Sequence, residues 1–118
     1  MAPVCLVIDD EPSILRLVAL VLEDLGCEAL QAADAETAER ILASTRPAFI
    51  ITDVRLPGID GLELARRVKA RTELSDTPVL LMSAFGEPRG HPGDAFLAKP
   101  FDIDGFTEFV KPYIGDGR

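Results

Sequence analysis

The sequence predicts an α/β fold, a three-layer, doubly wound domain in which helices cover both faces of a five-stranded parallel sheet. Short apolar runs alternate along the chain with longer segments whose apolar residues recur at helical spacing. Fully apolar runs are typical of parallel strands that are buried on both faces. Strands that alternate with helices imply right-handed crossovers between parallel neighbours. A chain of 118 residues suffices for one core, so we expect a single domain over residues 1–118.

The strands are predicted where short apolar runs lie between turn residues. They cover residues 4–8, 27–31, 48–52, 78–82 and 95–98. The run over residues 27–31 contains polar positions, so we expect that strand near an edge of the sheet. Cys5 and Cys27 both fall in predicted strands, where two small buried thiols are more common than a disulfide.

Four helices are predicted from apolar spacing and from their terminal residues. They run from the acidic segment around Pro12 to Gly26, over about residues 34–44, after Gly61, and from about Asp102. Pro47 stops the second helix, and Asp102 is a suitable N-cap for the last one. We expect Pro112 to distort the last helix or to end it early.

Residues 84–94 break this alternation. The segment contains two prolines and three glycines and has no apolar periodicity. Proline and glycine both disfavour a helix, so we expect a loop between the fourth and fifth strands. His91, the only histidine, lies within it and is interpreted as an ordinary loop residue.

The charge and the apolar pattern exclude several classes of partner. The formal net charge is −8, which repels nucleic-acid phosphates and anionic membrane surfaces. No apolar run approaches the length of a membrane span, and Asp9 and Asp10 interrupt the first apolar run after one strand length. We therefore expect a cytoplasmic protein that binds neither nucleic acid nor membrane through this domain.

Polar residues follow four of the predicted strands. They are Asp9 and Asp10, Asp53, Ser83, and Lys99. In open α/β sheets the functional site lies beyond the carboxyl ends of the strands, so these side chains are expected to meet at one edge. Two carboxylates about 4 Å apart repel by roughly 4 kcal/mol at an effective dielectric of ~20, and a cation among them relieves that repulsion.

The set fits phosphoryl transfer to an aspartate. Oxygen ligands in small number suit Mg²⁺, which also binds phosphate oxygens. Lys99 offers a positive charge and Ser83 a hydroxyl to an incoming phosphoryl group. An aspartate carboxylate is itself a nucleophile toward phosphorus. Taken singly, each residue has an ordinary alternative: Asp9 and Asp10 as helix caps, Asp53 as a turn residue, Lys99 as a surface lysine.

With these residues the sequence resembles the receiver domain of two-component response regulators, a flavodoxin-like fold. The resemblance extends from Val4 to about Tyr113. The matching segments are residues 7–11, 52–61, 80–84 and 96–101. It implies the strand order 2-1-3-4-5. It also implies a cis peptide bond between Lys99 and Pro100.

The resemblance implies a role for each site residue. Asp53 matches the phosphoacceptor, with Asp10, Asp53 and the Arg55 backbone carbonyl as ligands of Mg²⁺ (or Mn²⁺) and Asp9 assisting, often through water. Lys99 would pair with the phosphoryl group, Ser83 would turn toward it, and Phe96 would be the aromatic switch residue. The implied partners are a histidine kinase or histidine phosphotransfer protein, a downstream protein or fused output domain, and a second copy in a homodimer.

The sequence departs from the family between Ser83 and Lys99. These residues are 16 positions apart, about six fewer than usual, which is more than one helical turn. The missing segment corresponds to the family's fourth helix. The acceptor set is therefore expected to be intact while the fourth helix is shortened or replaced by a loop.

Two other functions fit parts of the pattern. A receiver-like interaction module that is never phosphorylated would keep the fold, but the complete acceptor set disfavours it. A magnesium-dependent phosphatase with an aspartyl intermediate would need a second acid two residues after Asp53, where Arg55 stands. The sequence fits both a stand-alone receiver and a part of a longer regulator or hybrid kinase.

Overall fold

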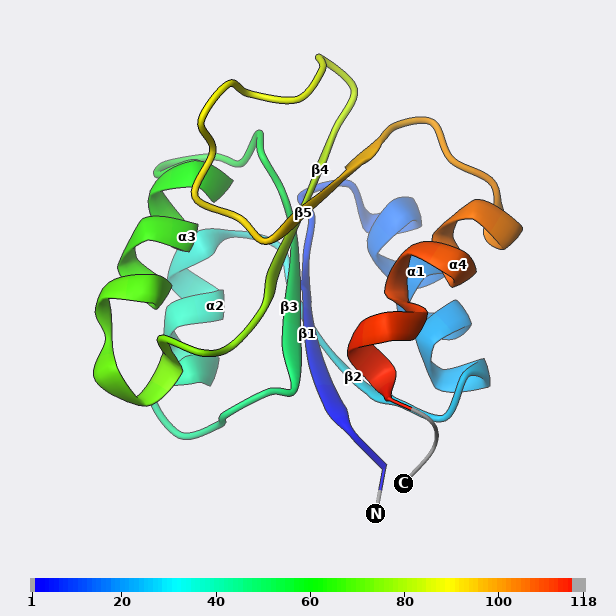
Figure 1. Cartoon of the computed structure of the whole chain (residues 1–118), viewed down its shortest axis with the longest axis horizontal. Helices are drawn as coiled ribbons and strands as arrows, with labels where there is room; N and C mark the ends of the chain where they lie inside the picture. Colours follow the sequence, from blue (N-terminus) through cyan, green and yellow to red (C-terminus); the bar gives the residue numbers. More distant parts are fainter. Residues whose placement is uncertain (1, 116–118) are drawn as a thin grey trace.

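The computed structural model describes residues 2–115, which form a five-stranded parallel sheet between two layers of helices (Figure 1). The strands are β1 (Val4–Ile8), β2 (Glu28–Ala32), β3 (Phe49–Asp53), β4 (Val79–Ser83) and β5 (Ala95–Ala98). The helices are α1 (Pro12–Asp24), α2 (Ala35–Leu42), α3 (Gly61–Ala70) and α4 (Ile103–Ile114), with a 3₁₀ turn at Thr72–Leu74. The sheet order is β2-β1-β3-β4-β5, as predicted.

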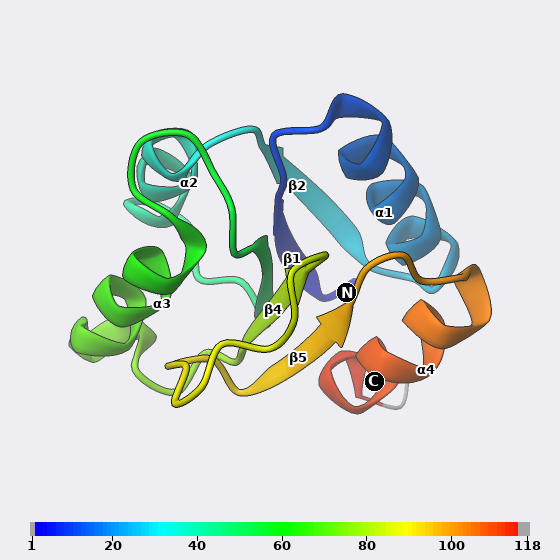
Figure 2. The same cartoon turned by 90° about the horizontal axis from the view of Figure 1, so that it is seen from above.

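The two helical layers enclose two cores. Helices α1 and α4 cover one face of the sheet, and α2 and α3 cover the other (Figure 2). Every residue of β3 and β4 is buried, because these central strands are covered on both sides. β2 has exposed positions and lies at an edge of the sheet, which confirms its predicted place.

Three of the four helices begin at an aspartate whose carboxylate accepts a hydrogen bond from a backbone N–H of the first turn. These caps are Asp34, Asp60 and Asp102. α1 differs: Pro12 is its first residue, and the side chain of its N-cap residue, Glu11, makes no capping bond. After α1, Gly26 adopts φ +96°, which lets the chain turn into β2.

Several bounds of the predicted elements are wrong. β3 and β4 begin and end one residue later than predicted, so Asp53 and Ser83 are the last residues of their strands. β2 begins at Glu28, so Cys27 lies just before the strand; Cys5 and Cys27 are buried free thiols. Burial is the main cause that raises the pKa of Cys5 to about 12. α4 continues through Pro112 to Ile114, because its inner face is anchored by buried Phe106 and Val110. Burial of those side chains outweighs the backbone bond that proline cannot make.

The loop prediction for residues 84–94 is confirmed. Every residue of this segment is described, and it contains turns but no helix. It lies above the N-terminal end of α3 and beside the sheet, on the α2–α3 side (Figure 1). Between β4 and β5 the fold thus has a loop, in the segment that is too short to contain the family's fourth helix. Among residues 2–115, no helix has both the length and the apolarity needed to cross a membrane.

α3 packs against the end of β3 through Gly61, where a β-carbon would overlap the carbonyl oxygen of Asp53. Gly61→Ala must therefore push α3 away from the residue that ends β3. We expect it to lower the free energy of unfolding by about 1–3 kcal/mol, as overpacking usually does. Urea denaturation followed by circular dichroism measures this difference.

Gly105→Ala is the matched control, because Gly105 is also in the first turn of a helix. Its added β-carbon meets only the flexible carboxylate of Asp102, at 3.0 Å. We expect it to change stability by less than about 1 kcal/mol, since alanine also has the higher helix propensity. Equal effects of both substitutions would show that contact with β3 is not the cause.

Candidate functional site

The register of the sheet brings the strand-end residues together. Ile8 of β1 is paired with Thr52 of β3, so the next residues, Asp9 and Asp53, stand side by side. Ser83 of β4 is paired with Ala98 of β5, so Lys99 lies one residue beyond. Because all five strands are parallel, the four strand ends meet at one edge, as the sequence predicts.

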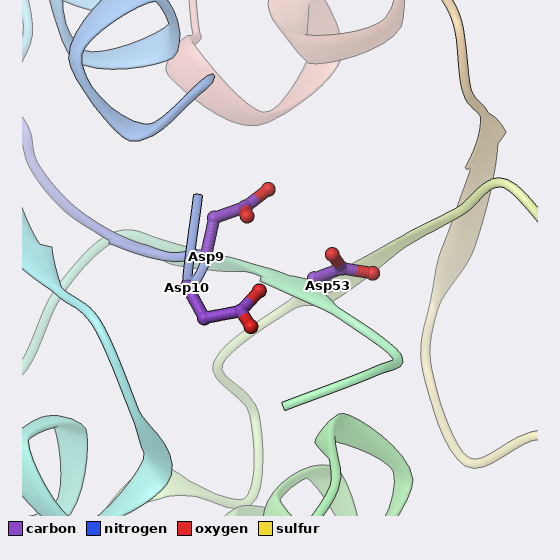
Figure 3. A group of neighbouring side chains, drawn as sticks. All are labelled: Asp9, Asp10 and Asp53. Atoms are coloured by element: carbon purple, nitrogen blue, oxygen red, sulfur yellow. The ribbon is translucent and has the colours of Figure 1, made fainter. Parts of the chain in front are cut away.

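Three carboxylates form the floor of this site. Figure 3 shows the side chains of Asp9, Asp10 and Asp53 grouped at the ends of two neighbouring strands. One oxygen from each lies within 4.8 Å of the other two. Asp9 and Asp53 are buried and Asp10 is exposed. Their mutual repulsion makes the site a strong attractor for a cation.

The ammonium of Lys99 lies between the two buried carboxylates. Its Nζ donates hydrogen bonds to Asp9 Oδ2 at 2.8 Å and to Asp53 Oδ2 at 2.9 Å, and Glu11 Oε1 lies 3.9 Å away. Burial by itself lowers the pKa of Lys99, but the bonds to Asp9 and Asp53 outweigh it, so that its pKa lies above the ordinary value. The lysine is therefore charged throughout the neutral pH range.

The remaining oxygens of the buried acids accept bonds from the main chain. Asp9 Oδ1 accepts from the N–H of Glu11 at 2.9 Å, and Asp53 Oδ1 accepts from the N–H of Arg55 at 3.3 Å. These are the turn and helix-start contacts that each aspartate could make without the other residues of the site. They occupy one oxygen of each residue and leave the other facing Lys99.

The other predicted site residues surround this centre. Ser83 is buried at the end of β4, and its Oγ accepts a hydrogen bond from the N–H of Phe85 at 3.0 Å. Arg55 is exposed, and its guanidinium lies 4.1 Å from the centre of the Phe85 ring. Phe96 is half-buried on β5 and packs in the core on the α2–α3 side. The peptide bond between Lys99 and Pro100 is cis, as predicted.

A pocket of about 400 Å³ opens beside Asp53 and Lys99. Its lining includes Asp10, Glu11, Arg55 and Phe85 as well. The sequence does not predict that Glu11 and Phe85 line this pocket. The signal for Glu11 is its position directly after the two aspartates, whereas nothing in the sequence indicates that Phe85 faces Arg55.

Comparison with known proteins identifies the class of this fold and site. Residues 5–111 match the model of the response regulator receiver domain, so the chain belongs to that family. It is 33% identical to sporulation initiation phosphotransferase F of Bacillus subtilis, over 92% of this chain and 91% of that protein. It is 32% identical to the transcriptional regulator RpaA of a Synechocystis strain, over 95% of this chain and 49% of RpaA. The chain thus spans about half the length of RpaA.

Solved structures of receiver proteins also match this chain. The response regulator TrrA of Thermotoga maritima, determined in complex with Mg²⁺ and BeF, is 31% identical and superposes with a TM-score of 0.85, covering 96% of this chain and 99% of TrrA. A second structure, of histidine kinase ThkA in complex with TrrA, matches at 30% identity and a TM-score of 0.84, covering 98% of this chain and 100% of that one. The chain is thus a receiver with an acidic pocket of the kind used in phosphoaspartate signalling.

The donor set fits a divalent ion. Three carboxylates on an open pocket give oxygen ligands while leaving room for water, which Mg²⁺ retains. We expect Mg²⁺ to raise the thermal unfolding temperature of the wild type in a concentration-dependent way. Asp10→Asn removes an anionic ligand, so it should raise the Mg²⁺ concentration needed for this stabilisation at least about tenfold. Glu11→Gln should retain most of it, since it leaves the three clustered carboxylates unchanged.

Removing the Lys99 ammonium should destabilise the protein when no metal is added. Lys99→Met leaves Asp9 and Asp53 close together without their shared partner. In EDTA we expect the free energy of unfolding to fall by about 1–3 kcal/mol, which is less than for breaking a fully buried ion pair. Because the folded-state pKa of Lys99 is raised, its contribution is present at neutral pH and up to about 10.4, and it is lost as pH rises through the folded-state value.

Lys111→Met is the control, because Lys111 pairs with Glu108 on the exposed face of α4. Exposed pairs contribute little, so we expect a change within about 0.5 kcal/mol. Urea unfolding at pH 7 and pH 9 measures both variants. A Lys99→Met protein as stable as wild type would contradict the charge balance described here.

Proposed function

We propose that this receiver accepts a phosphoryl group on Asp53 in a magnesium-dependent reaction and signals by changing conformation. The observation that carries the proposal is the position of Lys99, whose ammonium bridges Asp53 and Asp9 beside an open pocket. A receiver that had lost phosphorylation would have no need to keep a buried acid pair, a third carboxylate and a lysine at one point.

The donor is a histidine kinase or a histidine phosphotransfer protein. Support comes from the family and from the related regulator TrrA, which was solved in complex with the histidine kinase ThkA. The reaction takes place in the cytoplasm, where the catalytic domains of histidine kinases act. Residues 1–118 act as one receiver unit, and a downstream protein or fused domain reads the signal.

The chain's residues have distinct roles in transfer. An oxygen of Asp53 forms a bond to phosphorus as the bond from phosphorus to the donor's histidine nitrogen breaks, and that nitrogen keeps the electron pair. Lys99 exchanges its bond to Asp53 Oδ2 for one to a phosphoryl oxygen, so that its charge offsets the transferred group. The hydroxyl of Ser83 donates a hydrogen bond to another phosphoryl oxygen. These residues position and neutralise the group, which is what phosphoryl transfer mainly requires.

Asp10, Asp53 and the Arg55 carbonyl would hold Mg²⁺, with Asp9 assisting. When bound, the ion neutralises the charge that gathers on the phosphoryl oxygens. Phe96 is the aromatic residue that responds to phosphorylation. The chain accelerates its own phosphorylation and dephosphorylation, and we expect no turnover of external phosphate esters.

Acetyl phosphate with Mg²⁺ tests the proposal directly. Intact-mass spectrometry should show one added phosphoryl group on the wild type, because acetyl phosphate bypasses the kinase. Asp53→Ala should show none. Asp76→Ala removes an exposed aspartate beyond the 3₁₀ turn and should be modified like the wild type.

Absence of modification by acetyl phosphate and by purified histidine kinases would sink the proposal. That result would favour the alternative of a receiver-like interaction module that is never phosphorylated. Modification that persists in Asp53→Ala would place the acceptor elsewhere.

A further inference from the structure

Lys99 reaches the functional site only because β5 has one particular register against β4. Ser83 of β4 is paired with Ala98, and the N–H of the next residue, Lys99, donates to the carbonyl of Ser83 at 3.0 Å. Side chains on a strand alternate between the two faces of the sheet. A shift of β5 by one residue would therefore turn the Lys99 side chain to the other face and put Ala98 or Pro100 in its place.

The apolar pattern of β5 does not set this register. The strand has four residues, lies at the edge of the sheet and contains no fully buried position. Phe96 packs in the core on the α2–α3 side, where its ring centroid lies 6.3 Å from that of His91, whereas Leu97 packs in the core on the α1–α4 side. A one-residue shift would exchange the two, and each face would still receive an apolar side chain. Burial therefore distinguishes poorly between the two pairings.

The residue before β5, Asp94, is bonded to β4 through both its main chain and its side chain. Its N–H donates to the carbonyl of Val79 at 2.7 Å, and its Oδ2 accepts from the N–H of Val79 at 2.7 Å. Lys69 Nζ of α3 lies 2.6 Å from the same oxygen and also donates to the carbonyl of Thr77 at 2.8 Å. Asp94 therefore fixes the start of β5 to the start of β4 and to α3.

Gly93 and Asp94 together exclude the two neighbouring registers. A β-carbon on Gly93 would lie 2.8 Å from Leu81 Cγ and 3.0 Å from the carbonyl oxygen of Val79. If β5 shifted so that Asp94 took the place of Gly93, its side chain would overlap these atoms. If β5 shifted the other way, Gly93 would take the place of Asp94. The N–H of Val79 would then lose its carboxylate partner, and so would the ammonium of Lys69.

We infer that Asp94 is a positioning residue for Lys99. By fixing the start of β5, its carboxylate holds the strand in the register that brings the ammonium to Asp9 and Asp53. Asp94 acts through the strand, because the lining of the pocket beside Asp53 does not include it. The effect of Asp94 on phosphorylation rests on the proposed function, whereas its effect on the position of Lys99 does not.

Amide hydrogen exchange, followed by NMR in the full chain, tests the position of Lys99 without a phosphoryl donor. The N–H of Lys99 is bonded to Ser83 across the β4–β5 pair, so its exchange rate reports whether the register is kept. In Asp94→Ala we expect this amide to exchange at least about tenfold faster than in the wild type. The N–H of Ile50, bonded to Pro78 in the centre of the sheet, reports global unfolding and should be accelerated less.

The rate of modification by acetyl phosphate and Mg²⁺, measured by intact-mass spectrometry, tests the consequence for the reaction. Asp94→Ala should be modified at least about tenfold more slowly than the wild type, because a displacement of about 1 Å at a catalytic group suffices for such a loss. Asp94→Asn should restore a nearly wild-type rate, since its amide oxygen can accept the same two hydrogen bonds. In a Lys99→Met background, Asp94→Ala should cause no further loss, because no ammonium is left to misplace.

Leu42→Ala is the control for lost stability. Leu42 is buried on α2, which packs on β1 and β2, away from the edge of the sheet that β5 forms. Truncation of this side chain lowers stability but leaves β5 and Lys99 in place. We therefore expect the wild-type rate of modification at temperatures where the variant is folded.

Unchanged exchange at Lys99 in Asp94→Ala would overturn the inference, and so would a wild-type rate of modification in that variant. Equal slowing by Leu42→Ala, or a rate in Asp94→Asn as low as in Asp94→Ala, would also overturn it. If neither acetyl phosphate nor a histidine kinase modifies the wild type, the proposed function fails. Exchange at Lys99 then decides the inference alone, since that measurement needs no phosphoryl group.

Discussion

The structure depends on balancing two buried negative charges with one positive charge at the edge of a parallel sheet. Pairing of β1 with β3 places the backbone of Asp9 beside that of Asp53, so the two buried carboxylates lie close together. Two such charges repel by roughly 4 kcal/mol at about 4 Å and an effective dielectric of ~20. Lys99 supplies the compensating charge from β5, at the opposite side of the site from β1. The lysine therefore links strands that do not touch each other.

This balance stabilises the site and, in the proposed function, also prepares it to react. The Lys99 contact stabilises the resting protein, yet it also holds a cation where a phosphoryl group would arrive. Asp10 remains exposed, so the carboxylates are not fully compensated and the pocket keeps its attraction for a metal. The stabilising interaction and the chemistry proposed here therefore use the same atoms.

The fold was largely predictable from sequence because it depends on patterns that are local. Apolar runs ended by aspartate, serine or lysine identify the strands and their carboxyl ends, and parallel pairing then assembles the site. Boundaries were less certain. Pro112 lies within α4 because Phe106 and Val110 are buried, and burial is a tertiary effect that the proline signal does not contain.

The organisation of the loop was not predictable for a related reason. Glycines and prolines indicate that residues 84–94 form no helix, but they say nothing about the path that the chain takes instead. His91 was interpreted as an ordinary loop residue, yet it is mostly buried and both ring nitrogens are bonded. Such contacts depend on where β5 and Phe96 lie, which a single sequence does not indicate.

Anchoring of the loop by Asp94 has a consequence for how this part of the chain can vary. Because the end of the loop is fixed by bonds to Val79 and Lys69, the chain between β4 and β5 behaves as a closed segment. The entropy of closing a segment changes only with the logarithm of its length, so gaining about six residues alters stability by only about 0.4 kcal/mol and losing about six by about 0.7 kcal/mol. The entropic cost of changing the length of this segment is therefore small, so its surface can be remodelled while the acidic pocket stays unchanged.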